Sequence, residues 1–274
     1  MAVGEEAVNR LQRARSGGIA NLGQRRRPLR LPGRRARAPG RSLRRVLLNA
    51  AVSVVAVIAF LFAAGSVYVL SLPGVGDAEV RVDRILALHH GVDGGMPPPS
   101  KLGAAVVAVE DEHFYSNFLI NVLDGAGRAA LATLQTSQDP GGSTIAQQLA
   151  KQLYGHGTGL GATLREIGLG VKLSLRYSKA RILEMYLNAV YYGHGYWGDA
   201  AAARGYFGKN PDALDWAEAA MLAGLLEAPS AYDPLEHLTL AKQRQHHVLD
   251  QLVANHVLTP AQANAVLGEP LPLR

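Results

Sequence analysis

Residues 106–114 read VVAVEDEHF, and the interpretation of the whole chain begins from this stretch. It changes within a few residues from apolar valines to three successive acids, of which Glu110 is the first. In a helix, residues three and four apart share a face, so Glu110 falls beside the valines and Phe114. Burial at the edge of an apolar face would raise the pKa of Glu110 toward that of a working acid or base. A solvated acidic helix end is the alternative, and these nine residues alone do not separate the two.

Composition excludes several classes of protein. The chain has 274 residues, enough for one domain of about 150–200 residues and an extension. It has no cysteine, which excludes a disulfide framework and a thiolate site. The net charge of +6 comes from an arginine-rich stretch, residues 1–45, and the remainder is mildly acidic. The basic charge therefore belongs to a tail, and we expect no nucleic-acid partner.

The first 72 residues divide into two segments. Residues 1–45 carry glycine, proline and arginine without apolar periodicity, and we expect a disordered cytoplasmic tail. Residues 46–72 contain no charge and exceed the roughly 20 residues that cross a bilayer, which predicts a single transmembrane helix. A cleaved signal peptide is the alternative, although its apolar core is normally about 7–15 residues long. The arginines favour an N-terminus in the cytoplasm and a following domain on the outer side of the membrane.

The rest of the chain predicts a mainly α domain behind a connector. Residues 73–100 form the connector, which holds a short alternating piece, two exposed histidines and a triple proline that marks the boundary. Residues 101–274 form the domain, in which Thr144 and Gln147 have the spacing of a capping box. The helical pattern predicts helices at residues 102–115, 125–136, 144–154, 164–177, 179–192, 200–207, 216–228, 239–256 and 260–267.

Four polar clusters interrupt these helices. They are Glu110–Asp111; Ser143–Thr144 with Gln147, Gln148 and Lys151; Glu166; and Ser178–Lys179 with Glu184. Two carboxylates together with lysine and hydroxyl donors suit glycosyl transfer, in which one acid removes a proton from a sugar hydroxyl. Simple glycosidases also use paired carboxylates, so the residue types leave both reactions open.

Several segments together resemble one enzyme family. They are EDEHFY (110–115), GGSTIAQQLAKQLY (141–154), YSKARILEMYLNAVYYG (177–193), AAARGYFGK (201–209) and AEAAMLAGLLEAPSAYDP (217–234). In this order they resemble the motifs of the family 51 glycosyltransferases, the peptidoglycan glycosyltransferase domain of class A penicillin-binding proteins and of monofunctional transglycosylases. The resemblance covers about residues 95–268 and implies a lysozyme-like α fold.

The resemblance also implies a reaction. The substrate would be lipid II, a disaccharide carried on undecaprenyl pyrophosphate, and the product a β-1,4 glycan strand. Glu110 would be the base that deprotonates the acceptor 4-hydroxyl, and Glu166 would assist the leaving pyrophosphate directly or through a divalent metal such as Mg²⁺ or Mn²⁺. The substrate-binding candidates are Asp111, Ser143, Thr144, Gln147, Gln148, Lys151, Arg128 and Lys179.

The expected environment follows from the same resemblance. No organic cofactor is expected, and we place no metal at any histidine. The partners would be lipid II, the growing glycan chain, the bilayer and a separate transpeptidase. Residues 118–120 are candidates for contact with lipid, and an ordinary core is the equal alternative.

The sequence departs from the family pattern at cationic positions. Asn117 and Leu119 replace a usual histidine and glycine, Ala162–Thr163 replace a basic pair, and Glu227 replaces a common lysine. A charge-assisted hydrogen bond is worth about 1.5–3 kcal/mol, so the departures would weaken a pyrophosphate site.

Two outcomes are open. Other cations could compensate for these departures, and the candidates are Arg128, Lys172 and Arg176. The alternative is a weak or inactive family member that binds lipid II or partners in cell-wall synthesis. A lytic enzyme that cleaves glycan is a third interpretation, which the GGST–QQL–K segment does not favour.

Overall fold

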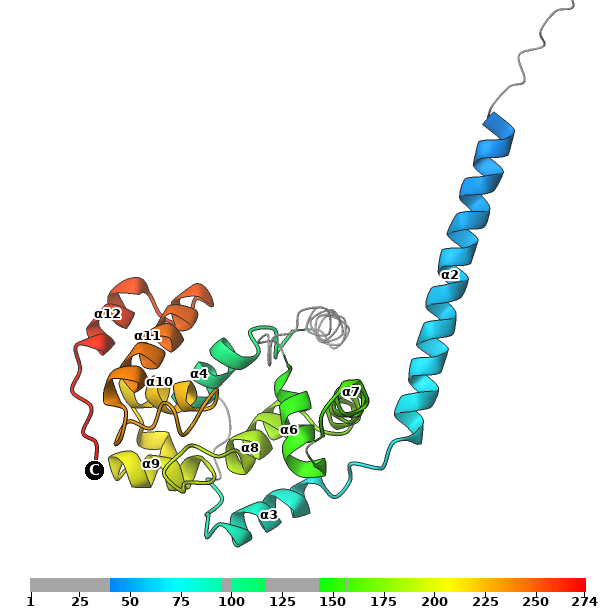
Figure 1. Cartoon of the computed structure of the whole chain (residues 1–274). Coiled ribbons are helices and arrows are strands. Elements are labelled where there is room, and N and C mark those ends of the chain that lie inside the picture. Colours follow the sequence, from blue (N-terminus) through cyan, green and yellow to red (C-terminus); the bar gives the residue numbers. More distant parts are fainter. Residues whose placement is uncertain (1–39, 95–99, 117–142, 156) are drawn as a thin grey trace, which may run out of the picture. The chain divides into compact units, whose positions relative to one another are not determined.

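The computed structural model describes residues 40–94, 100–116, 143–155 and 157–274. The predicted tail up to residue 39, the predicted helix at residues 125–136 and the candidate lipid contacts at residues 118–120 lie outside the described residues. We describe the N-terminal helix and the helical domain separately (Figure 1).

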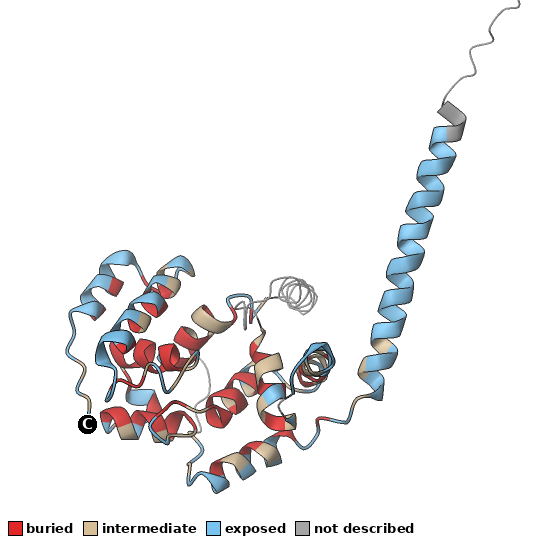
Figure 2. Ribbon diagram, in the orientation of Figure 1, coloured by how far each residue is buried: buried red, intermediate tan, exposed pale blue. Residues whose placement is uncertain are grey.

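The helix α2 (Gly40–Ser71) contains the predicted transmembrane segment. Its stretch Leu43–Ser71 is long and apolar enough to cross a membrane, and it is the one described helix that meets this criterion. Its most apolar 18 residues are not buried inside the protein, and Figure 2 shows the helix exposed along most of its described length. An apolar surface on every side of a helix is stable in lipid rather than in water. The helix begins at Gly40, so the prediction of disorder through residue 45 was wrong for its last residues.

The domain is built from helices, as predicted. No strand occurs in the described residues, and Tyr191 and Trp197 form an isolated bridge. In chain order the helices are α3 (Ala78–Leu88), α4 (Lys101–Glu110), α6 (Ile145–Tyr154), α7 (Leu160–Arg176), α8 (Lys179–Ala189), α9 (Asp199–Phe207), the short 3-10 helix η2 (Pro211–Ala213), α10 (Trp216–Leu225), α11 (Leu238–Ala254) and α12 (Pro260–Leu267).

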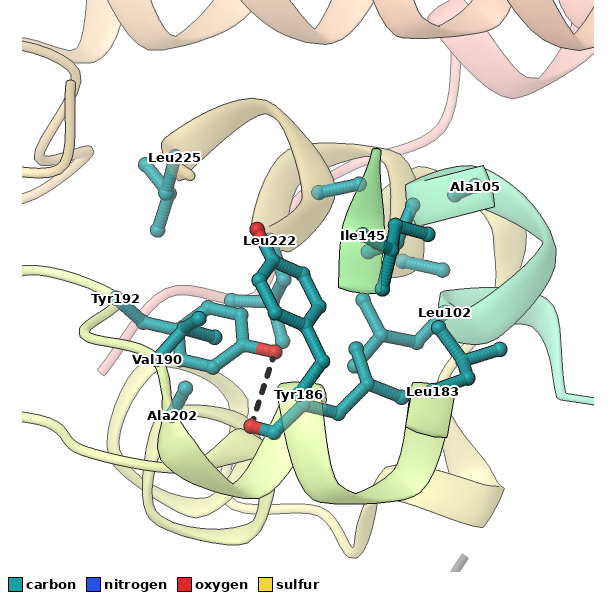
Figure 3. Packing of buried hydrophobic residues seen from close by; sticks show 14 of the residues in the cluster. Leu102, Ala105, Ile145, Leu183, Tyr186, Val190, Tyr192, Ala202, Leu222 and Leu225 are labelled. Carbon is teal, nitrogen blue, oxygen red and sulfur yellow. Dashed lines mark hydrogen bonds between the residues drawn. The ribbon is translucent and has the colours of Figure 1, made fainter. Parts of the chain in front are cut away.

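The core lies around α10 and α8. Every residue of α10 from Ala217 to Leu225 is buried, and this helix packs against α4 on one side and α11 on another. Apart from Glu218 in its first turn, the buried part of α10 is apolar on every side, and a helix of this kind is stable in the interior of a domain. Figure 3 shows the adjoining part of the core, where Leu102 of α4, Ile145 of α6 and Tyr186 of α8 meet.

Local sequence signals set several helix starts. Thr144 and Gln147 form the predicted capping box of α6, and Asp215 with Glu218 does the same for α10. Ser178 caps α8 by accepting a hydrogen bond from the Arg181 backbone. These caps satisfy backbone N–H groups that a helix start leaves without partners.

Some predicted boundaries were wrong. The helix predicted at residues 102–115 ends at Glu110, and the one predicted at 179–192 ends at Ala189. In the first case Asp111 leaves helical conformation with φ −157° and ψ 77°, and its carboxylate accepts a hydrogen bond from Ile145. The helix therefore ends where Asp111 contacts Ile145, a residue distant in sequence. Local periodicity cannot predict such a contact. The helix α7 begins at Leu160, earlier than the predicted residue 164.

The predicted connector also contains folded structure. Residues 78–88 form α3, which packs against α8 and α6 and buries Ala78, Val82 and Leu86. The apparent alternation in this stretch reflects a helix with one narrow apolar face. His89 and His90 are exposed, as predicted, and His89 stacks on Trp197 with 4.1 Å between ring centroids.

Candidate functional site

Glu110 lies at the last residue of α4, and its side chain is half-buried, as the sequence predicted. The Nε2 atom of Gln148, on α6, donates a 2.7 Å hydrogen bond to Oε2 of Glu110. The Oε1 atom of the same amide accepts a 2.6 Å hydrogen bond from the Tyr186 hydroxyl on α8. Three helices thus position one carboxylate, and a hydrogen bond to its charged form favours ionisation.

Asp111 connects the end of α4 to the start of α6. Its side chain is 9% exposed, and Oδ2 accepts a 3.2 Å hydrogen bond from the backbone N–H of Ile145. A carboxylate at a helix N-terminus is stabilised by the N–H groups that point toward it. Asp111 was a substrate-binding candidate, and the structure gives it a structural contact that aligns the two helices carrying Glu110 and Gln148.

A pocket lies beside these residues, between α6, α7 and the start of α8. It brings together predicted residues from separate clusters, with Asp111, Thr144, Gln147 and Lys179 in its lining. The remaining lining residues are Phe114, Ala146, Ile167, Gly170, Val171 and Ser174. The pocket therefore joins a carboxylate and an ammonium group with the polar start of α6.

Close packing of α6 and α7 forms one wall of this pocket. At Gly170 of α7, a Cβ atom would lie 3.1 Å from both the backbone nitrogen and the side chain of Gln147. A residue without a side chain therefore permits the approach of the two helices at the point where α6 begins.

Lys179 is the cationic residue in the lining of this pocket. Its ammonium nitrogen lies 4.7 Å from the centre of the Phe114 ring. Burial lowers the pKa of Lys179, and the nearby charge of Asp111 opposes that change. Lys179 thus places a cation in the pocket lining beside an aromatic ring, and its role in substrate binding stays a prediction.

The other predicted residues occupy different positions. Glu166 is half-buried on α7, directly before the pocket residue Ile167. Ser143 is half-buried just before α6, and Lys151 is exposed near the end of α6. Arg128, Asn117 and Leu119 lie outside the described residues.

The structure tests two of the cations considered as replacements. Lys172 donates hydrogen bonds to the backbone carbonyls of Leu70, Leu72 and Pro73. Carbonyls at the end of a helix attract a cation, so Lys172 is engaged at the end of α2. Arg176 is exposed in the last turn of α7.

Glu227 also has a structural partner. It pairs with Arg244 at 2.9 Å, and the Arg244 side chain is only 15% exposed. Glu227, which stands where the family commonly has a lysine, therefore forms an ion pair with Arg244 on α11.

The sequence analysis missed two polar groups. Asp199 at the start of α9 is 1% exposed, and burial raises its pKa to about 6. His194, Asp233 and Glu236 bring ligand atoms within 4.8 Å of one another, a set that could hold a divalent cation. His194 Nδ1 lies 3.0 Å from the Asp233 carboxylate. Neither group belongs to a local sequence motif, because the burial of Asp199 depends on tertiary packing and the cation-binding set combines His194 with the distant Asp233 and Glu236.

Comparison with known proteins identifies the family. A family model described as Transglycosylase matches residues 96–253, more than half of the chain. “Putative transglycosylase H16_A0665” of Cupriavidus necator is 40% identical over 177 residues, which cover 64% of this chain and 76% of that protein. The chain belongs to the transglycosylase family, the glycosyltransferases shared with class A penicillin-binding proteins.

Longer relatives share only this domain. Penicillin-binding protein 2D of Bacillus subtilis is 41% identical over 61% of this chain and 24% of its own length. Penicillin-binding protein 1A of Neisseria gonorrhoeae is 40% identical over 63% of this chain and 22% of its own length. The chain thus spans about a quarter of these two relatives.

Proposed function

We propose that the protein is a membrane-anchored, monofunctional peptidoglycan glycosyltransferase that polymerises lipid II. The observation that carries the proposal is the half-buried Glu110, which accepts a hydrogen bond from Gln148 in a chain of the transglycosylase family. A partly desolvated carboxylate that is oriented by a hydrogen-bond donor is suited to act as a general base.

The reaction requires one proton transfer and one displacement. Glu110 takes the proton of the acceptor 4-hydroxyl, and the oxygen attacks the anomeric carbon of the donor sugar. The bond to the lipid pyrophosphate breaks with inversion, and a β-1,4 bond forms. The acceptor proton ends on Glu110, and the negative charge leaves with the pyrophosphate.

Other residues have supporting parts in this proposal. Lys179 and the polar start of α6 line the pocket and would face the anionic donor. Asp111 and the Thr144–Gln147 capping box hold the start of α6 in place. Lys151, Ser143 and Arg128 are further substrate-binding candidates.

A divalent cation fits the chemistry of Glu166. Mg²⁺ is commonly held by one or two carboxylates together with substrate phosphates, and Glu166 offers one half-buried carboxylate on α7, a helix that contributes other residues to the pocket. The ion, when bound, would neutralise charge that develops on the leaving pyrophosphate. Glu166 would then serve as the protein ligand, or would interact with the leaving group directly.

The location of the reaction follows from the helix α2. We propose that Leu43–Ser71 spans the bacterial plasma membrane with the arginine-rich end in the cytoplasm. The domain would then meet lipid II at the outer surface, and a separate transpeptidase would cross-link the product.

The deciding experiment measures polymer formation from labelled lipid II by the detergent-solubilised full chain. Glu110→Gln is compared with Glu112→Gln, which changes an exposed acid two residues away. We expect polymer from the wild type and from Glu112→Gln, and none from Glu110→Gln. A wild type that binds lipid II without forming polymer would replace the proposal with a binding role, which the departures at Ala162, Thr163 and Glu227 would then explain.

A further inference from the structure

We propose that Tyr186 is a positioning residue that holds the side-chain amide of Gln148 in the orientation that donates to Glu110. The inference rests on the proposed function, because it assigns Tyr186 a role in preparing the general base. In this role Tyr186 acts through the Gln148 amide and not on the substrate.

A continuous chain of two short hydrogen bonds carries the inference. The Tyr186 hydroxyl donates to Gln148 Oε1 at 2.6 Å, and Gln148 Nε2 donates to Glu110 Oε2 at 2.7 Å. Tyr186 is 2% exposed, and Figure 3 shows it among the apolar residues of the core. The amide therefore lies between a fixed hydroxyl and the carboxylate.

The two ends of an amide are chemically opposite. Its nitrogen donates and its oxygen accepts, whereas an ionised carboxylate can only accept. A rotated Gln148 amide would turn its oxygen toward Glu110 and repel the charge there. A tyrosine hydroxyl can donate or accept, so the acceptor-only carboxylate selects the productive orientation, and the Tyr186 hydroxyl holds the amide there by donating to its oxygen on the side away from Glu110.

The hydroxyl is kept as a donor. Burial raises the pKa of Tyr186 well above its usual value, and the charge of Glu110 raises it further. Tyr186 thus remains protonated at neutral pH. Phenylalanine at this position would fill the same core space and leave the Gln148 oxygen without this donor.

The same core offers a matched control. Tyr192 is fully buried near Tyr186, and its hydroxyl lies 3.4 Å from the Leu187 backbone carbonyl (Figure 3). Tyr192→Phe therefore removes a buried hydroxyl from the core without touching the amide of Gln148.

The experiment uses the full chain in detergent and four variants: Tyr186→Phe, Tyr192→Phe, Gln148→Ala and Tyr186→Phe with Gln148→Ala. Lipid II polymerisation gives kcat and KM, and thermal unfolding reports stability. Carbon-13 NMR of glutamate-labelled protein gives the pKa of the Glu110 carboxyl, with the signal assigned by its loss in Glu110→Gln. Asp111 is next to Glu110 in the chain, and Lys179 lines the pocket. Both residues are unchanged in every variant.

We expect Tyr186→Phe to lower kcat about tenfold with KM nearly unchanged, since a hydrogen bond of this kind is worth up to about 1.5 kcal/mol. The pKa of Glu110 should rise, because its charged form loses a fixed donor. Tyr192→Phe should alter neither quantity. In the Gln148→Ala background, Tyr186→Phe should lower kcat less than about twofold, because the two residues act through one contact.

The inference is overturned if Tyr186→Phe leaves both kcat and the Glu110 pKa as they are in Tyr192→Phe. It is also overturned if the loss in kcat is undiminished in the Gln148→Ala background. The titration separates this inference from the proposed function. If the wild type shows no polymerase activity but Tyr186→Phe still raises the pKa of Glu110, the positioning role of Tyr186 stands and the proposed function is refuted.

Discussion

The side-chain amide of Gln148 on α6 donates a 2.7 Å hydrogen bond to Glu110 at the end of α4. This contact joins two sequence motifs, at residues 110–115 and 141–154, that are separated by residues 116–140. It gives a hydrogen-bond donor to the carboxylate that the proposed reaction uses as its base. The orientation of that carboxylate therefore depends on the position of α6.

Gln148→Ala should therefore lower kcat for lipid II polymerisation. A hydrogen bond to a charged group is worth about 1.5–3 kcal/mol, which corresponds to a loss of roughly 10- to 100-fold. Steady-state polymerisation measures the effect. Gln152→Ala changes a half-buried glutamine one turn later on α6 and should retain activity. Equal losses in the two variants would contradict a specific role for Gln148.

The capping box of α6 should affect both stability and activity. Thr144→Ala removes the hydrogen bond from the Gln147 backbone and should cost about 0.5–2 kcal/mol of unfolding free energy. Thr259→Ala removes the matching bond of α12 and should cost a similar amount. Denaturant unfolding and polymerisation assays are compared for both. We expect lower activity only for Thr144→Ala, because α6 carries Gln148; a loss of activity in Thr259→Ala as well would show that reduced stability is the cause.

Asp199 should make stability depend on pH. Burial raises its pKa from 3.8 to about 6 in the folded protein, so the folded state binds this proton more tightly than the unfolded state does. Its contribution to stability is therefore lost as pH rises from about 4 to about 6. Asn remains neutral and can still accept the hydrogen bond from the Ala200 backbone.

We expect Asp199→Asn to gain stability relative to the wild type across this window, up to about 3 kcal/mol at pH 7. Denaturant unfolding at several pH values measures the difference. Asp212→Asn, at an exposed position, serves as the control. A constant difference between wild type and Asp199→Asn from pH 4 to pH 7 would show that Asp199 titrates normally.

The orientation of the membrane anchor can be measured directly, because the chain contains no cysteine. Ser230→Cys places one thiol at an exposed position of the domain, and Ser16→Cys places one in the arginine-rich tail. A maleimide that cannot cross membranes should label Ser230→Cys in intact cells, and Ser16→Cys only after lysis. The reverse pattern would refute an N-terminus in the cytoplasm.

Much of the fold could be predicted from sequence because its signals are local. The apolar run of α2, the capping boxes at Thr144 and Asp215, and the cap at Ser178 each depend on residues within a few positions of one another. The family motifs likewise singled out Glu110 and Glu166 as candidates. Helix ends were less predictable, as at Glu110, where a contact between Asp111 and Ile145 ends α4.

The sequence by itself determined the helical class, the apolar segment, the caps and the residue types available for chemistry, because these follow from short-range periodicity and side-chain identity. Only the tertiary structure decided which of those residues meet. It joined Glu110, Gln148 and Tyr186 from three helices, and it engaged Lys172 and Glu227 in structural contacts. Hydrogen bonds between distant segments depend on how helices pack, and packing is a property of the whole core rather than of any short stretch.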